Sequence, residues 1–421
     1  MKGWRKEIST VVFVIVIAFL VGCGSGIDPE REDEATVAVE TSLPVASPIA
    51  DIVAGNLARG WQHYHDGEYN LAVIEFDQAV KLDPHFAEAY LNRGLAFYMS
   101  GDLENALHDF EQAFELDLNP QSAEVFVRRG RALSIQEDYE GAIDDFNSAA
   151  ALDPEYVETY DRRGFVYLRF GNLERAIEDF DRAIELDPEY LAAYVRRGLA
   201  HRGLGELSRA IEDFDRAIEL DPENALVYMS RGSVYQERGA VIGDYEQAIA
   251  DFSEAIVLDP EINDAYLLRG MAYVIIGESD KAIADLDRVI AELDQIDSLG
   301  PDSAQAYFNR GLAFFYKFNF GKAIDDLEKA IELNPTSIET FAVLGNAYDN
   351  NGQYKEALAS YEAALALAPE PGQRALILYD RGQAYARHGD TSLAVSDVEM
   401  ALELGLDPGL EQDAEAMLES L

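Results

Sequence analysis

The stretch RAIEDFDRAIELDPE fills residues 175–189 and returns, letter for letter, at residues 209–223. Within each copy the apolar residues recur at spacings of three and four, as at Ala176, Phe180 and Ala183, which is the period of one face of an α-helix. The closing pair Asp187-Pro188 offers a cap and a favourable first residue to a following helix. The stretch therefore predicts an amphipathic helix that leads directly into another helix.

The same frame extends over most of the chain. A glycine marks each copy, an alanine follows it by about twelve residues, and a large apolar residue, Phe in the first copies, comes four residues later. Gly and Ala suit the places where two helices of one unit approach too closely for larger side chains. The most frequent step between glycines is 34 residues, and the ten glycines are Gly60, Gly94, Gly130, Gly164, Gly198, Gly232, Gly270, Gly311, Gly345 and Gly382.

This pattern of Gly, Ala, Phe, Ala and a closing Pro on a 34-residue period resembles the tetratricopeptide repeat. The resemblance covers about residues 54–408 and implies an all-α fold, a right-handed superhelix (α-solenoid) of about ten helix-turn-helix units. We expect these units at residues 51–407, with a polar-faced capping helix at 408–421 that covers the end of the stack.

One correlation inside the frame predicts ion pairs. An arginine precedes the glycine in nine of the ten units, and an acidic residue stands in the second half of the same nine units. The tenth unit, with Leu344 and Ser360, lacks both partners. Since arginine and acid are absent together from one unit, we expect each pair to form within its own unit, as between Arg163 and Asp179 or between Arg197 and Asp213.

The resemblance also implies a ligand groove lined by the first helix of each unit. In the third to fifth units the implied lining positions hold six arginines, and the first, second and eighth units hold apolar and amide side chains. Arginine forks bind carboxylates, so we expect an extended acidic or C-terminal peptide there. The alternative stays open that the arginines pair with Glu124, Glu158 and Asp161, which leaves a neutral groove. The candidate residues are Arg128, Arg131, Arg162, Arg169, Arg196, Arg202, Trp61, Asn92, Tyr98, Asn309 and Phe315.

The N-terminus predicts export and lipidation. A positively charged start and a short apolar stretch lead to Leu20-Val21-Gly22-Cys23, which resembles the lipobox of bacterial lipoproteins. By that resemblance residues 1–22 are a signal peptide, Cys23 carries the lipid, and residues 23–50 are an acidic, Pro-containing tether. The protein is then lipid-anchored to the bacterial cell membrane or outer membrane and faces the extracytoplasmic side. The alternative is an uncleaved signal anchor with an incidental cysteine.

Charge and composition exclude several classes of function. The formal net charge is −46, which repels nucleic acid and anionic lipid. With one cysteine, the chain forms no intrachain disulfide and no Cys-based zinc site. No Walker loop, nucleophile elbow or calcium loop occurs, so we expect no metal, no cofactor and no enzyme activity.

These observations favour a membrane-anchored protein-interaction scaffold that binds partner peptides. The alternative is an assembly factor, either pilotin-like or a subunit of a secretion, pilus or cell-envelope complex. An enzyme is the third class, and the repeats leave no room for a catalytic domain.

Overall fold

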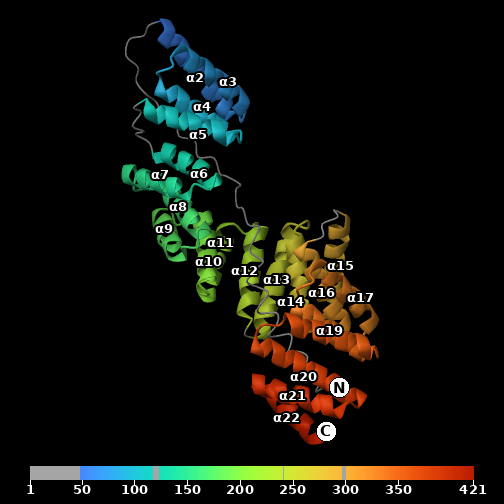
Figure 1. Cartoon of the computed structure of the whole chain (residues 1–421). Coiled ribbons are helices and arrows are strands. Elements are labelled where there is room, and N and C mark those ends of the chain that lie inside the picture. The colour runs from blue at the N-terminus through green and yellow to red at the C-terminus, as the bar shows by residue number, and fades with distance from the viewer. Residues whose placement is uncertain (1–47, 117–122, 240, 296–299) are drawn as a thin grey trace. The chain divides into compact units, whose positions relative to one another are not determined.

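The computed structural model describes residues 48–116, 123–239, 241–295 and 300–421, and all regular structure in these ranges is helical (Figure 1). The all-α fold expected from the repeat is confirmed. The described residues divide into two compact units, residues 48–222 and residues 223–421. The predicted signal peptide, Cys23 and most of the predicted tether lie outside the described residues.

The unit of residues 48–222 contains five consecutive helix pairs, in each of which the first helix packs on the second. The first helix begins at Pro48, three residues before the repeat start expected at 51, because proline is a favourable first residue of a helix. Its helices are α2 (Pro48–His65), α3 (Tyr69–Leu82), α4 (Ala87–Met99), α5 (Leu103–Glu115), α6 (Ala123–Ile135), α7 (Tyr139–Leu152), α8 (Val157–Arg169), α9 (Leu173–Leu186), α10 (Leu191–Gly203) and α11 (Leu207–Leu220).

The unit of residues 223–421 contains five further pairs and a final single helix. That last helix lies in the segment 408–421, where the sequence predicts a cap, and buries Leu410 and Ala414. The helices are α12 (Ala225–Arg238), α13 (Ile242–Leu258), α14 (Asn263–Ile276), α15 (Ser279–Gln295), α16 (Pro301–Tyr316), α17 (Phe320–Leu333), α18 (Ile338–Asn350), α19 (Tyr354–Leu367), α20 (Pro371–His388), α21 (Thr391–Leu404) and α22 (Pro408–Ser420).

Close packing inside each pair explains the repeated glycine. A Cβ added to Gly164 would lie 2.8 Å from Cε1 of Phe180, and one added to Gly345 would lie 2.6 Å from Cε1 of Tyr361. Phe180 and Tyr361 are themselves fully buried. The ring on the second helix thus occupies the space that a side chain on the first helix would need, and the fold requires glycine there.

An arginine and a carboxylate join the two helices of nine pairs. Arg163 donates from Nε to Oδ2 of Asp179 at 2.8 Å and from Nη2 to Oδ1 at 2.6 Å, so both oxygens of the carboxylate are engaged. This geometry agrees with the sequence correlation, which predicts that each arginine pairs with the acid of its own helix pair. The other pairs are Arg59–Glu75, Arg93–Asp109, Arg129–Asp145, Arg197–Asp213, Arg231–Asp251, Arg269–Asp285, Arg310–Asp326 and Arg381–Asp397.

Five of these arginines also reach the preceding pair of helices. Arg163 donates from Nη1 to Asn147 at 2.8 Å, and Arg93 donates from Nη1 to Asp77, also at 2.8 Å. Arg269 donates to Ser253 at 3.0 Å in the same way. One guanidinium therefore joins two helices of its own pair to the second helix of the pair before it.

The exceptional unit replaces this ion pair by an apolar and a hydroxyl side chain. Leu344 and Ser360 are both buried, and the hydroxyl of Ser360 donates to the carbonyl of Glu356 on its own helix at 3.0 Å. No charge is left without a partner when both members change together. The structure thus gives a physical reason for their joint absence.

Candidate functional site

Charge is unevenly divided between the helices of the third, fourth and fifth pairs. The first helices, α6, α8 and α10, carry nine arginines and three carboxylates, whereas the second helices, α7, α9 and α11, carry four arginines and twelve carboxylates. Three of the nine arginines are those paired with the second helices. The remaining six are the arginines that the sequence marks as candidate ligand residues.

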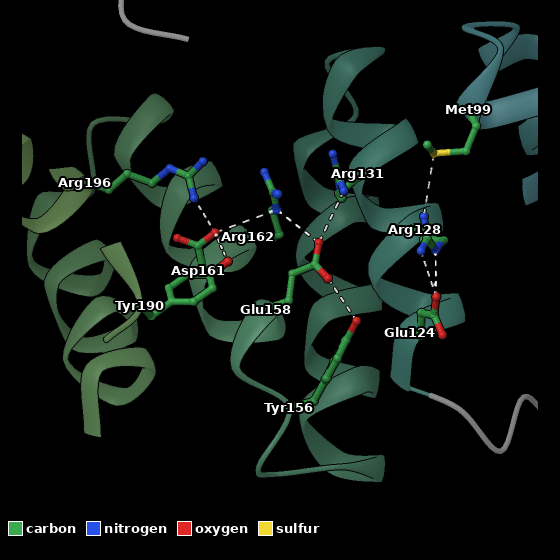
Figure 2. A network of polar contacts seen from close by, with 10 residues as sticks. All are labelled: Met99, Glu124, Arg128, Arg131, Tyr156, Glu158, Asp161, Arg162, Tyr190 and Arg196. Atoms are coloured by element: carbon green, nitrogen blue, oxygen red, sulfur yellow. Dashed lines mark hydrogen bonds and ion pairs between the residues drawn. The ribbon is translucent and has the colours of Figure 1, made fainter. Parts of the chain in front are cut away.

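Four of these six arginines lie in one polar network with three carboxylates (Figure 2). At one end of the network Asp161 is fully buried and accepts hydrogen bonds from Arg196 and from the hydroxyl of Tyr190, the latter at 3.3 Å. Nε of Arg162 lies 3.7 Å from the same carboxylate. Burial raises the pKa of the Tyr190 hydroxyl, and the charge of Asp161 raises it further, so this hydroxyl remains a donor at neutral pH.

Glu158 occupies the middle of the network. Its Oε1 lies 3.3 Å from Nη1 of Arg131 and 3.3 Å from Nε of Arg162, and its Oε2 accepts from the hydroxyl of Tyr156 at 2.9 Å. Burial raises the pKa of Tyr156 and the charge of Glu158 raises it further, which keeps this donor protonated. One carboxylate therefore bridges α6 and α8.

Arg128 forms a more local pair at the other end of the network. It donates from Nε and Nη2 to Oε1 of Glu124, one turn earlier on α6, at 3.0 and 2.8 Å. Its Nη1 lies 3.9 Å from the sulfur of Met99. These four arginines therefore pair with Glu124, Glu158 and Asp161 in the structure, which is the alternative that the sequence left open.

The other two candidate arginines lie outside the network drawn in Figure 2. Arg169 is the last residue of α8 and is exposed, and Arg202 is half-buried near the end of α10. Both belong to the same three first helices. The six arginines against Glu124, Glu158 and Asp161 give this set of side chains an excess of positive charge in a strongly acidic chain.

The apolar and amide candidates are largely enclosed in the packing rather than presented for a ligand. Asn92 and Tyr98 on α4 are 3% and 9% exposed, and Asn309 and Phe315 on α16 are 3% and 6% exposed. Trp61 on α2 is half-buried and stacks on His65 at a centroid distance of 5.8 Å. These side chains fill space between neighbouring helices. The groove positions implied by the resemblance do not distinguish such packing residues from residues that bind a ligand.

Tyr156 and Tyr190 are network residues that the sequence analysis did not select. Each follows the same tripeptide Asp-Pro-Glu, at 153–155 and 187–189, just before α8 and α10. A tyrosine at this place occurs after only these two Asp-Pro-Glu turns, whereas Asn224 and Ile262 follow other Asp-Pro turns. This difference between repeats is the sequence signal that could have identified Tyr156 and Tyr190 as network residues.

Neither a candidate metal site nor a membrane-spanning helix is found in the described part of the chain. No group of three or more His, Cys, Asp or Glu side chains in it is arranged to hold a metal ion. In the same ranges, no helix is both long enough and apolar enough to cross a membrane.

Comparison with solved structures finds helical repeat proteins. A tetratricopeptide repeat protein from Parabacteroides merdae is 21% identical, with a TM-score of 0.45, over 62% of this chain and 98% of that chain. YrrB, described as a TPR protein with an unusual peptide-binding site, is 25% identical, with a TM-score of 0.40, over 47% of this chain and 96% of its own. PilF from Pseudomonas aeruginosa is 18% identical, with a TM-score of 0.44, over 51% and 95%.

Family models match most of the repeat region, whereas no curated protein matches the chain. Models described as tetratricopeptide repeats match residues 87–120, 123–156, 162–225, 241–298, 304–337 and 338–371, and a model described as a TPR repeat matches residues 60–101. The chain therefore belongs to the tetratricopeptide repeat family, whose members are generally non-catalytic scaffolds suited to protein–protein interaction.

Proposed function

We propose that the protein is a lipid-anchored scaffold that binds an acidic segment of a partner protein on helices α6, α8 and α10. The observation that carries this proposal is the excess of arginine among the candidate residues of these three helices, six against the three carboxylates of the same helices, in a chain with a net charge of −46. An acidic surface repels an acidic partner everywhere except where cations gather. The arginine-rich helices are therefore the part of the described surface best suited to such a partner.

The internal pairs support this proposal because they keep the arginines oriented. Glu158 holds both Arg131, on the preceding pair of helices, and Arg162, one turn later on its own helix, and these two side chains are 10% and 13% exposed. A guanidinium already fixed in a carboxylate-binding position loses less side-chain entropy when a ligand binds. The network thus preorganises the cations for carboxylates of either source, acidic side chains or a chain terminus.

Photocrosslinking tests where the partner binds. A photoreactive amino acid in place of Arg169, exposed at the end of α8, is expected to trap the partner in cells. The same amino acid in place of Arg182, whose side chain on α9 of the same pair is 40% exposed, serves as the control. Equal trapping from both positions, or trapping from position 182 alone, would place the interaction elsewhere. The peptide trapped at position 169, read by mass spectrometry, is expected to be rich in Asp and Glu or to include a C-terminus.

The anchor is the second part of the proposal. Cys23 follows a signal-like stretch and precedes the acidic segment at 24–50, an arrangement typical of a lipoprotein with a tether. We expect Cys23→Ser to abolish the incorporation of radiolabelled palmitate and to shift the protein from the membrane fraction to the soluble fraction. Ser25→Ala, a change two residues away, is the control. A processed Cys23→Ser variant that stays in the membrane fraction contradicts lipid anchoring.

A further inference from the structure

One carboxylate of the polar network differs from the others because it is partly exposed and also bridges arginines of two helix pairs. The side chain of Glu158 is 27% exposed and bridges Arg131 on α6 to Arg162 on α8. We propose that Glu158 occupies the place of a ligand carboxylate and that binding of an acidic segment displaces it. This inference rests on the proposed function and adds a self-inhibiting contact to it.

Asp161 cannot take this role because it is fixed by its surroundings. Its side chain is fully buried and accepts from Arg196 and Tyr190, both contributed by the following pair of helices. Moving Asp161 out would leave Arg196, itself 3% exposed, without this carboxylate in the interior. Asp161 is therefore a permanent part of the network, whereas Glu158 lies where water already reaches it.

The contacts of Glu158 are also long compared with those of the structural pairs. Both of its arginine contacts measure 3.3 Å. The pair between Arg163 and Asp179 measures 2.8 and 2.6 Å, and the side chain of Asp179 is 8% exposed. Charge-assisted hydrogen bonds of good geometry are short, so the bonds to Glu158 are weak for their class. A ligand carboxylate that is free to choose its position can make shorter ones.

Exchange of one carboxylate for another requires little rearrangement. Glu158 is a flexible side chain in the first turn of α8, and rotation of its side chain torsions moves the carboxylate into water. The incoming carboxylate then accepts from Arg131, Arg162 and the hydroxyl of Tyr156, so no cation is left without a counter-charge. Because the ligand must displace Glu158, the free energy of the Glu158 contacts makes ligand binding weaker by that amount.

The test measures binding of fluorescein-labelled hexaglutamate to the full-length chain by fluorescence anisotropy. Glu158→Gln is expected to bind this probe roughly fivefold more tightly than the wild type, because a neutral amide competes less for the guanidinium groups. Glu155→Gln is the matched control, since Glu155 is exposed, lies three residues away and changes the net charge equally. Its affinity should stay within about twofold of the wild type, which is the general electrostatic effect of one surface charge.

A second variant keeps the charge of Glu158 and loosens its position. Tyr156→Phe removes the donor to Oε2 and is expected to change the affinity less than Glu158→Gln does, because the same hydroxyl also serves the ligand. Amidated and free-acid forms of hexaglutamate, with hexaalanine as a third probe, separate side-chain carboxylates from the terminal carboxylate. Thermal melting of each variant checks that the fold is intact.

Two failures can be told apart in this titration. If hexaglutamate binds the wild type, if Arg162→Gln weakens that binding by roughly tenfold or more, and if Glu158→Gln leaves it unchanged or weaker, the displacement proposal is wrong and the binding surface stands. If neither the wild type nor Glu158→Gln binds any of the three probes, both proposals are wrong. Tighter binding by Glu158→Gln, with Glu155→Gln unchanged, supports both.

Discussion

Replacing Arg163 by leucine is expected to lower the free energy of unfolding of the α8–α9 region by about 3 kcal/mol or more. The side chain of Asp179 is 8% exposed and takes both of its strong hydrogen bonds from Arg163. Removing the cation leaves a carboxylate in a poorly hydrated place. The change also removes the bond from Arg163 to Asn147 on the preceding pair. Hydrogen exchange of the backbone amides of α8 and α9 is the measurement, because repeat proteins can unfold locally.

The double variant Arg163→Leu with Asp179→Ser should regain most of this loss. It reproduces the combination of Leu344 and Ser360, which the protein already accommodates in a helix pair of the same architecture. Losses from Arg163→Leu and Asp179→Ser that simply add would contradict direct coupling between the two side chains. The control is Arg59→Leu, since the side chain of Arg59 is 57% exposed and its pair with Glu75 should contribute under about 1 kcal/mol.

The pH dependence of Arg163→Leu follows from the pKa of Asp179. Burial raises the pKa of this carboxyl, and the hydrogen bonds from Arg163 oppose the rise. In the variant the opposing effect is lost, so the folded protein holds this proton more tightly than the unfolded chain does. Stability therefore increases as the pH falls through the interval between the raised pKa and the ordinary carboxyl pKa. The defect of the variant should shrink as the pH falls from neutral toward the ordinary carboxyl pKa, whereas Asp179→Ser in the same background should show no such recovery.

The helix pairs could be predicted from the sequence because the residues that enforce them are local and repeated. Gly164 and Phe180 lie sixteen residues apart on two helices of one unit, and the glycine is needed since the ring fills its side-chain space. The pairing of Arg163 with Asp179 could also be inferred, because one unit, with Leu344 and Ser360, lacks both members.

Contacts between successive helix pairs were harder to predict. The acceptor that Nη1 of the arginine meets on the preceding pair is an aspartate in three cases but Asn147 and Ser253 in two others, so the residue type is not constant in the sequence. Burial of Asn92 and Phe315 likewise depends on how closely successive first helices pack. The sequence places such residues on a face, and the distance between neighbouring helices decides whether that face is open.

The partners of the candidate arginines were left as two alternatives for the same reason. Glu158 and Arg162 are four residues apart on one helix, which the sequence shows, but Arg131 comes from the preceding pair. Whether one carboxylate reaches both guanidinium groups depends on the spacing of α6 and α8. In the structure Glu158 contacts both Arg131 and Arg162. Because its side chain is also partly exposed, we infer that a ligand carboxylate can replace it.

Loss of ligand binding on removal of two arginine charges is the second large effect. Arg128→Gln with Arg162→Gln removes two cations whose nearer carboxylate partners, Glu124 and Glu158, are each 27% exposed and can be rehydrated, while the buried Asp161 keeps its pair with Arg196. Each charge-assisted contact to a ligand carboxylate is worth about 1.5–3 kcal/mol, so loss of two contacts should lower the affinity for hexaglutamate by roughly 100-fold or more. Reversal at Arg196 is a poorer test, because a carboxylate there would face the buried Asp161 and destabilise the fold.

The affinity of the full-length chain for hexaglutamate, compared between two double variants, tests the arginine-rich helices as the binding surface most directly. The control, Arg182→Gln with Arg216→Gln, removes two arginines whose side chains on α9 and α11 are 40% and 41% exposed, and it has the same net charge as Arg128→Gln with Arg162→Gln. We predict a loss of roughly 100-fold or more for the variant on α6 and α8 and a change within about threefold for the control. Equal losses in both variants, or no loss in either, would contradict a specific acidic-ligand site on α6, α8 and α10.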